Sequence, residues 1–238
     1  MNYRDYEFAN IAVRIINPSD FFIEKSKDYE TTKDVELVIE ISDADLAFEK
    51  EWSKEYKYEN YGEELYQFSA IYRKLSEYIC QKNIMLLHGS AFEYNNQCVI
   101  VTAPSGTGKS THSRLWREAF GDKVTMINDD KPLLQVSGND VLVWGTPWDG
   151  KHNISVNKSV PLKAICILER SAENKVEKVK VGDCLEALLN QVYRPRQVEN
   201  LVKVMELAKN IFEQVEIYKI YCNMEIDAAK VVKQKIFN

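Results

Sequence analysis

The stretch CVIVTAPSGTGKSTHSRLWREAF, from Cys98 to Phe120, decides the fold class of this chain of 238 residues. It opens with a short apolar run, which is typical of a central strand covered on both faces. It closes with His112, Leu115, Trp116 and Ala119 at i, i+3, i+4 and i+7, which predict an amphipathic helix that ends before Gly121. Between them, A-P-S-G-T-G-K-S follows the pattern G-x-x-x-x-G-K-[ST], with Ala103 in place of the first glycine. The stretch therefore predicts a phosphate-binding loop in an α/β fold.

The loop contains the residue types that phosphate binding requires. Glycine at positions 106 and 108 allows torsion angles at which several backbone N–H groups converge on one anion. Lys109 can reach terminal phosphates, and the Ser110 hydroxyl can bind magnesium. The positive end of the following helix points at the same anion. We therefore expect ATP and Mg²⁺ as ligands, and the residues expected to bind them are Ser105, Gly106, Thr107, Gly108, Lys109, Ser110 and Thr111.

Ala103 occupies the corner at which the chain leaves the strand, outside the part of the loop that holds phosphates. Alanine fits this corner if its φ is negative, and the following Pro104 favours an extended conformation there. The substitution is therefore expected to change the start of the loop and to leave the anion site intact.

Two acidic residues, Asp129 and Asp130, follow the strand predicted for VTMIN. Successive strand residues point to opposite sides, so one acid can face a metal ion and the other an incoming hydroxyl group. The sequence N-D-D-K-P is also typical of a plain turn. The position after a buried strand favours the functional interpretation.

Three more places carry candidate site residues. His88 precedes Gly89 at the end of the strand expected for MLL, although a lone histidine is more often structural. The segment GTPWDGKHN contains Lys151, which could neutralise charge on a transferring phosphate. Arg194 and Arg196 lie at a helix break, where exposed arginines are usually only solvated.

The first fifty residues are expected to be β structure, with strands in FANIAVRII, FFIEK and DVELVIEIS. The charged, tyrosine-rich segment KEWSKEYKYENYGE is expected to cross the surface, and Leu65 to Gln81 is expected to be helical. Whether the N-terminal strands form a subdomain or extend the main sheet is left open. Further strands are predicted in MLLHG, VLVWG, KAICILE and VEIYKIYC.

The last quarter of the chain is predicted to be mainly helical. Two apolar stripes are expected to face the core, and a closing helix is expected over Ala228 to Ile236. The first stripe is Leu185, Leu188, Leu189 and Val192, and the second is Val198, Leu201, Val202, Met205 and Phe212.

Composition excludes several classes of protein. The net charge is −5 and there is no block of Lys or Arg, which argues against nucleic acid as the main partner. No apolar run reaches the roughly 20 residues that span a bilayer, and no secretory signal is recognised, so no membrane partner is expected. The five cysteines are scattered and never in C-x-x-C spacing. They are interpreted as reduced core thiols of a cytoplasmic protein, without zinc or disulfides.

Taken together, His88-Gly89, A-P-S-G-T-G-K-S and N-D-D resemble the catalytic core of HPr kinase/phosphorylase. ATP-dependent phosphoenolpyruvate carboxykinase shares this nucleotide fold. The resemblance covers roughly Leu87 to Arg170. It implies a mixed sheet, with an N-terminal β extension and C-terminal helices. We divide the chain into a β-rich region, residues 1–60, and a P-loop kinase-like domain, residues 61–238.

The resemblance also implies roles at the matching positions. His88 would lie beside the transferred phosphate and the acceptor, and Lys109 would hold the terminal phosphates. Asp129 would be the general base, and Asp130 would bind magnesium together with Ser110, although these two roles can be exchanged. Lys151 is the candidate for a further phosphate-binding residue beyond the aspartates.

The chain departs from the family pattern in two places. Thr111 stands where the family commonly has Glu, and no clean copy of L-E-x-R-G is found. The acceptor is therefore left open between a protein, a peptide and a small molecule. The choice of donor among ATP, GTP and pyrophosphate, the assembly of several copies and the reverse reaction are left open as well. The expected activity is transfer of a phosphoryl group from Mg-ATP to a hydroxyl, most simply of serine. The alternatives are a non-catalytic nucleotide switch and, less in keeping with the chain length, a phosphoenolpyruvate carboxykinase.

Overall fold

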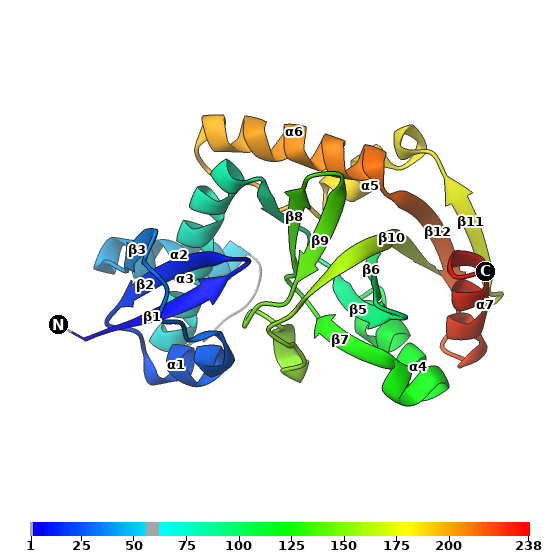
Figure 1. Ribbon diagram of the computed structural model, residues 1–238, viewed down its shortest axis with the longest axis horizontal. Helices are drawn as coiled ribbons and strands as arrows, with labels where there is room; N and C mark the ends of the chain where they lie inside the picture. Colours follow the sequence, from blue (N-terminus) through cyan, green and yellow to red (C-terminus); the bar gives the residue numbers. More distant parts are fainter. Residues whose placement is uncertain (1, 56–61) are drawn as a thin grey trace.

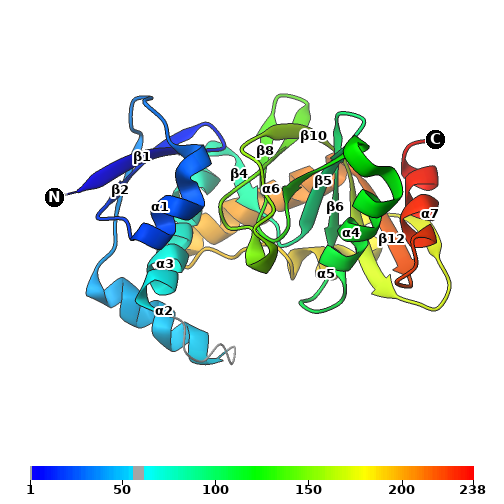
Figure 2. The ribbon, with the colours of Figure 1, turned by 90° about the horizontal axis from the view of Figure 1, so that it is seen from below.

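The computed structural model describes residues 2–55 and 62–238, and within them it contains twelve strands and seven α-helices (Figure 1). The strands form a three-stranded sheet near the N-terminus and a nine-stranded mixed sheet in the rest of the chain. The predicted α/β class with a mixed sheet is therefore confirmed. The two ends of the chain lie at opposite ends of the molecule in both ribbon views (Figure 2).

The large sheet runs in the order β4-β8-β9-β10-β6-β5-β7, and β12 pairs with β10 and β11. Its central strand β6 pairs in parallel with β10 and antiparallel with β5, as its apolar sequence predicts. Its strands are β4 (Ile84–Leu86), β5 (Ser90–Tyr94), β6 (Gln97–Thr102), β7 (Val124–Asn128), β8 (Leu133–Ser137), β9 (Asp140–Trp144), β10 (Ser159–Arg170), β11 (Lys175–Val179) and β12 (Glu216–Cys222).

Strand β10 belongs to both halves of this sheet. Its first residues pair antiparallel with β9, and from Leu162 onward it pairs in parallel with β6, with a shift of register between Leu162 and Ala164. From Ala164 it also pairs in parallel with β12. The carboxyl ends of β6, β10 and β12 therefore meet at one edge of the sheet.

Helices cover both faces of the large sheet. Two helices, α4 (Lys109–Phe120) and α7 (Asp227–Ile236), contribute to one apolar cluster with Ala164, Cys166 and Leu168 of β10. On the other face, α5 (Leu185–Leu189) and α6 (Val198–Gln214) pack on Ile165 and Ile167. Because β10 is buried on both faces from Ala164 to Leu168, its sequence there, AICIL, is apolar throughout, as expected for a central strand.

The predicted apolar stripe of α6 is wrong. Val198 is 74% exposed and Val202 is 52% exposed. The buried face instead contains Val204, Leu207, Ala208, Ile211 and Phe212. Of the predicted stripe, only Phe212 is fully buried.

Four strands were not predicted: β5, β8, β11 and β1 (Tyr3–Phe8), of which the predicted FANIAVRII includes only Phe8. The chain enters β5 directly after His88-Gly89 and turns into β6 at Asn95 and Asn96, both of which have positive φ. Two such residues between antiparallel strands form the tight hairpin turn that matches the strand twist. The predicted strand MLLHG is only partly right, because β4 ends at Leu86.

The N-terminal strands form a sheet of their own, in the order β1-β2-β3. In this sheet, β1 (Tyr3–Phe8) and β2 (Ile11–Ile16) form an antiparallel hairpin. Strand β3 (Leu37–Glu40) pairs in parallel with β2. The predicted strand FFIEK is wrong, because these residues lie in α1 (Asp20–Ser26). The Ser19 hydroxyl accepts a hydrogen bond from the Phe22 N–H, and this N-cap with Asp20 in the first turn starts a helix.

The segment expected to cross the surface is helical at its start. Lys50 to Glu55 belong to α2 (Asp43–Glu55), and residues 56–61 lie outside the described residues. The predicted helix over Leu65 to Gln81 is confirmed as α3 (Glu63–Ile79), which buries Phe68, Ile71 and Leu75.

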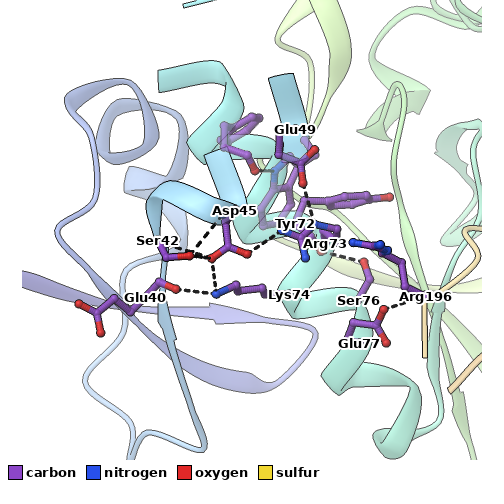
Figure 3. A network of polar contacts seen from close by, with 12 residues as sticks. Glu40, Ser42, Asp45, Glu49, Tyr72, Arg73, Lys74, Ser76, Glu77 and Arg196 are labelled. Carbon is purple, nitrogen blue, oxygen red and sulfur yellow. Dashed lines mark hydrogen bonds and ion pairs between the residues drawn. The ribbon is translucent and has the colours of Figure 1, made fainter. Parts of the chain in front are cut away.

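A polar network joins α2 to α3 (Figure 3). The Arg73 guanidinium donates to Glu49 at 2.7 Å and to Asp45 at 2.8 Å, and the Lys74 ammonium lies 2.7 Å from Asp45. Burial alone raises the pKa of the Asp45 carboxyl, but hydrogen bonds from Lys74, Ser42 and Arg73 outweigh it and hold this pKa well below its usual range. The network therefore anchors α2 on the outer side of α3.

Candidate functional site

The loop between β6 and α4 has the backbone shape that the glycine pattern predicts. Gly106 and Gly108 have φ values of 77° and 125°. Residues that carry a Cβ atom rarely adopt such values. Ala103 is buried and is not among the described residues with positive φ, so it fits the corner at the end of β6. The departure from glycine at this position is therefore accommodated.

Two basic side chains, those of Lys109 and Arg170, donate hydrogen bonds to backbone carbonyl groups of this loop. The Lys109 ammonium donates to the Ala103 carbonyl at 2.9 Å and to the Pro104 carbonyl at 3.4 Å. The Arg170 guanidinium donates to the Thr107 carbonyl at 2.9 Å and also to the Gly106 carbonyl. Sequence reasoning missed Arg170, because it lies 61 positions beyond Lys109 and reaches the loop only through the pairing of β10 with β6.

The two aspartates lie on a turn that Asn128 shapes. The side-chain carbonyl oxygen of Asn128 accepts hydrogen bonds from the backbone N–H groups of Asp130, at 2.8 Å, and Lys131, at 2.6 Å. Its amide nitrogen donates to Thr146, whose hydroxyl donates to the Lys131 carbonyl. The two sequence pieces N-D-D-K and G-T-P-W-D-G are therefore parts of one hydrogen-bonded unit.

Asp129 points into the protein beside β5. Its Oδ1 accepts a hydrogen bond of 2.7 Å from the hydroxyl of Ser90, and both residues are buried. Ser90 is the second residue after His88, so the start of β5 supplies partners to the carboxylates that follow β7.

Asp130 lies between His88 and Lys131. His88 Nε2 is 3.3 Å from Asp130 Oδ1, and the Lys131 ammonium is 3.4 Å from Oδ2. The other ring nitrogen of His88 faces Gln191 Oε1 at 3.1 Å. Burial raises the pKa of the Asp130 carboxyl, but the hydrogen bond from His88 and the charge of Lys131 outweigh it, so that this pKa is lowered.

The glycine of the His88-Gly89 pair has a steric reason. A Cβ atom on Gly89 would lie 2.8 Å from the Ile100 side chain and 3.0 Å from the Val101 carbonyl oxygen. The Gly89 N–H donates to the Asp130 carbonyl, and the Thr102 hydroxyl donates to the His88 carbonyl. The close approach of this segment to β6 thus places His88 beside the aspartates.

The aspartates and the loop lysine face one another closely enough to interact electrostatically. Burial lowers the pKa of the Lys109 ammonium, and the negative charges of Asp130 and Asp129 oppose that shift. The structure therefore brings together His88, Lys109, Asp129 and Asp130, which are at most 42 positions apart in the sequence.

Lys151 lies in the short helix η4 (Gly150–His152), and its side chain is exposed. The neighbouring Gly150 packs on Asp130, because a Cβ atom there would be 3.2 Å from the Asp130 Cβ. Lys151 therefore follows, in the sequence, the glycine that packs on Asp130, and it lies at the rim of the site.

The arginines at the helix break have structural partners. The Arg196 guanidinium lies 4.1 Å from the centre of the Phe48 ring, and the backbone N–H of Arg196 donates to the Glu77 carboxylate (Figure 3). Arg194 donates to Asn190 at 3.1 Å and is exposed. A role for either in phosphate binding stays a prediction.

Ser110 and Thr111 are half-buried in the first turn of α4, at the end of the loop. Over residues 2–55 and 62–238, no group of three or more His, Cys, Asp or Glu side chains is arranged to hold a metal ion. The described helices include none with the length and apolar composition of a membrane span.

The architecture and the site geometry together define an α/β protein with a glycine-rich loop facing two carboxylates. Residues 60–228 match the family described as SynChlorMet cassette protein ScmC, and the chain belongs to this family. None of the curated proteins compared with the chain matches it.

Among solved structures, the chain is similar to one described as "Structure of the Hpr(Ser) kinase/phosphatase from Coxiella burnetii". The TM-score is 0.37 and the sequence identity is 10%, and the match covers 63% of this chain and 95% of that chain. This is a distant similarity of fold.

Proposed function

We propose that the protein is a kinase that transfers a phosphoryl group from Mg-ATP to a hydroxyl group of a protein, peptide or small molecule, serine being the simplest acceptor. The observation that carries this proposal is that hydrogen bonds hold His88 and Asp130 at the end of β6, where the loop begins: the Gly89 N–H donates to the Asp130 carbonyl, and the Thr102 hydroxyl donates to the His88 carbonyl. A phosphate held by the loop amides and Lys109 would lie between the loop and the carboxylates. Phosphoryl transfer depends mainly on such positioning and on stabilisation of charge.

The carboxylate contacts favour one of the two assignments left open by the sequence. Both oxygens of Asp130 already face cationic or hydrogen-bonding groups, His88 and Lys131. Ser90 engages Oδ1 of Asp129, which leaves Oδ2 for a metal ion. We therefore assign Asp129, with Ser110, to magnesium and Asp130 to the acceptor hydroxyl.

These residues suit the chemistry expected of each. A serine hydroxyl and a carboxylate are the oxygen ligands that Mg²⁺ prefers, and the ion would neutralise charge on the phosphates. Asp130, whose pKa is lowered mainly through His88 against the effect of burial, stays ionised at neutral pH and can accept the proton of a hydroxyl. His88, oriented by Gln191, holds this carboxylate in place.

The family description calls its members cassette proteins. We propose that the acceptor is encoded beside this protein, and a product of a neighbouring gene is the first acceptor to test. The exposed Lys151, next to the glycine that packs on Asp130, is the residue proposed to meet it.

The proposal is tested by incubating the protein with labelled ATP and a cell extract, followed by mass spectrometry of the labelled product. Lys109→Ala should lower transfer and nucleotide affinity together. Asp130→Asn should lower transfer by at least about 100-fold, because general bases contribute about 10² to 10⁴ in rate, and should still bind ATP. Asp122→Asn, an exposed aspartate beyond α4, is the matched control and should react like the unaltered protein.

Three results would count against different parts of the proposal. Failure of the unaltered protein to bind ATP would exclude an ATP site. Binding of ATP without phosphorylation of any acceptor would favour a non-catalytic switch. Full transfer by Asp130→Asn would reject only the role of Asp130.

A further inference from the structure

A row of basic and aromatic side chains begins beside Asp130 and leads away from the phosphate loop toward α2. We call it the basic strip, and it consists of Lys131, Tyr72, Tyr193, Arg196 and Phe48. Tyr72 is buried, Arg196 is exposed, and the other three are half-buried. The kinase proposal uses none of these side chains.

Ring contacts make the basic strip continuous. The Lys131 ammonium lies 5.1 Å from the centre of the Tyr72 ring, and the rings of Tyr72 and Tyr193 pack edge to face with centres 5.4 Å apart. Arg196 follows Tyr193 by three residues, and its guanidinium lies 4.1 Å from the centre of the Phe48 ring. Such cation–π contacts hold a charged group at a defined place on the surface.

The acidic side chains beside the basic strip are already paired. Asp45 and Glu49 both accept hydrogen bonds from Arg73 (Figure 3). Glu77 accepts from the backbone N–H of Arg196, and its carboxylate is beyond ion-pair distance of the guanidinium. Over residues 2–55 and 62–238, the Arg196 guanidinium has no carboxylate partner, although the net charge of the chain is −5. It is therefore available to a carboxylate from outside the chain.

Lys131 is the second cation of the basic strip. Its ammonium lies 3.4 Å from Oδ2 of Asp130, the carboxylate proposed to accept the proton of the acceptor hydroxyl. A hydroxyl that binds to Asp130 therefore arrives next to Lys131, whose side chain is 38% exposed. A carboxylate that is close to the hydroxyl in the acceptor can pair with this ammonium.

We propose that the basic strip binds an acidic segment of the acceptor, with Asp or Glu near the phosphorylated hydroxyl on Lys131 and a further acid on Arg196. The inference rests on the proposed function and names the class of acceptor as an acidic protein or peptide. Two cations with two tyrosine rings between them suit a chain of several residues, and Tyr and Arg are enriched where proteins bind one another.

The test uses two fluorescein-labelled peptides, one with two glutamates on each side of a central serine and one with two lysines on each side. Fluorescence anisotropy at low ionic strength, with Mg²⁺ and a non-hydrolysable ATP analogue, gives their affinities. The unaltered protein should bind the acidic peptide at least about fivefold more tightly, because complementary charge attracts and like charge repels.

The variants test whether Arg196 causes this preference. Arg196→Gln should weaken binding of the acidic peptide by about threefold to fivefold, the upper range for an exposed ion pair, and should bind ATP as the unaltered protein does. Arg196→Glu should weaken it further and favour the basic peptide. Arg4→Gln, at an exposed arginine of β1 that pairs with Glu30, is the matched control and should change neither affinity.

The outcomes separate this inference from the kinase proposal. Equal affinity for the two peptides, or unchanged binding of the acidic peptide by Arg196→Gln, would overturn the basic strip as an acceptor surface and leave the kinase proposal standing. Binding of the acidic peptide that depends on Arg196, without phosphorylation of any acceptor in the extract, would keep the surface and reject the kinase. A phosphorylated product flanked by Lys or Arg would also overturn the inference.

Discussion

At the scale of single residues, the site depends on how Asp130 is held. Its carboxylate is shared by His88 on one oxygen and Lys131 on the other. Lys131 also lies 5.1 Å above the ring of Tyr72, a residue of α3 in the N-terminal part of the molecule. The carboxylate is therefore coupled both to the segment before β5 and to a helix outside the large sheet.

The pH dependence of stability tests this pairing. Burial raises the pKa of the Asp130 carboxyl, and the His88 hydrogen bond is the strongest of the effects that lower it. A carboxyl group with a lowered folded-state pKa stabilises the fold above its unfolded pKa, about 4, and this contribution is lost as the pH falls through the folded-state pKa. Between about pH 5 and about pH 2, unfolding free energy should fall less in His88→Asn than in the unaltered protein.

Urea unfolding at each pH gives this comparison. His152→Asn replaces an exposed histidine of η4 and should follow the unaltered protein. An equal loss of stability in His88→Asn and the unaltered protein would show that His88 does not stabilise the Asp130 carboxylate.

The sequence predicts the site residues that belong to compact motifs, and misses those that reach the site through the fold. Asp129, Asp130 and Lys109 are marked by their positions after apolar strands. Gln191 contacts His88 only because the isolated pairing of Leu87 with Val192 brings the last quarter of the chain to this point. No local pattern could indicate that pairing, but Asn128 could have been recognised, since Asn before two acids is typical of a side chain that caps a turn.

At the scale of elements, α6 shows how a helix can mislead sequence analysis. Both faces of its first half carry apolar residues, so two stripes compete along the sequence. The structure buries the stripe that includes Leu207 and Ile211 against β12 and β4, and leaves Val198 and Val202 exposed. Periodicity alone cannot choose between two such stripes, because only the packing partner decides which one is covered.

This rotation of α6 predicts unequal effects of two similar truncations. Ile211→Ala removes a fully buried side chain and should lower the unfolding free energy by about 2 to 5 kcal/mol. Val202→Ala, half exposed on the opposite stripe, should change it by no more than about 0.5 kcal/mol. Chemical denaturation gives the unfolding free energy of both variants. A larger decrease in Val202→Ala than in Ile211→Ala would mean that the stripe predicted from the sequence is the buried one.

At the scale of the whole molecule, Trp148 joins the N-terminal part to the large sheet. It lies in the loop after β9, is 3% exposed, and packs on Phe8, Phe68 and Tyr72. Its indole N–H donates to the Phe68 carbonyl at 3.0 Å. The next residue but one, Gly150, contacts Asp130, so the same loop reaches both the aromatic cluster and the site.

Trp148→Ala should therefore destabilise the protein by about 3 to 5 kcal/mol, as loss of a buried aromatic side chain usually does. Hydrogen exchange should show the largest loss of protection in β1 and β2, because Phe8 of β1 and Val13 of β2 belong to the same cluster. Tyr3→Ala, at a side chain that is about half exposed, serves as control and should change stability by no more than about 0.5 kcal/mol. Unchanged exchange in β1 and β2 would show that Trp148 does not anchor this part.

The α/β class could be predicted because strands and helices alternate around a loop with a specific glycine pattern. The arrangement of the N-terminal part could not, since its sheet is completed by α3 and Trp148, which are far from it in sequence. The alternating residues of its strands indicate a buried face without identifying what covers it.

Strand β10 sets a limit on how the chain length can vary. Its residues from Ala164 alternate between the cluster under α4 and the cluster under α6, with Ala and Cys on one face and Ile on the other. Inserting or deleting one residue there would exchange the faces and turn Arg170 away from the loop. The turn after β10, residues 171–174, carries no such alternation. Natural or engineered insertions are therefore tolerable in that turn and incompatible with the strand before it.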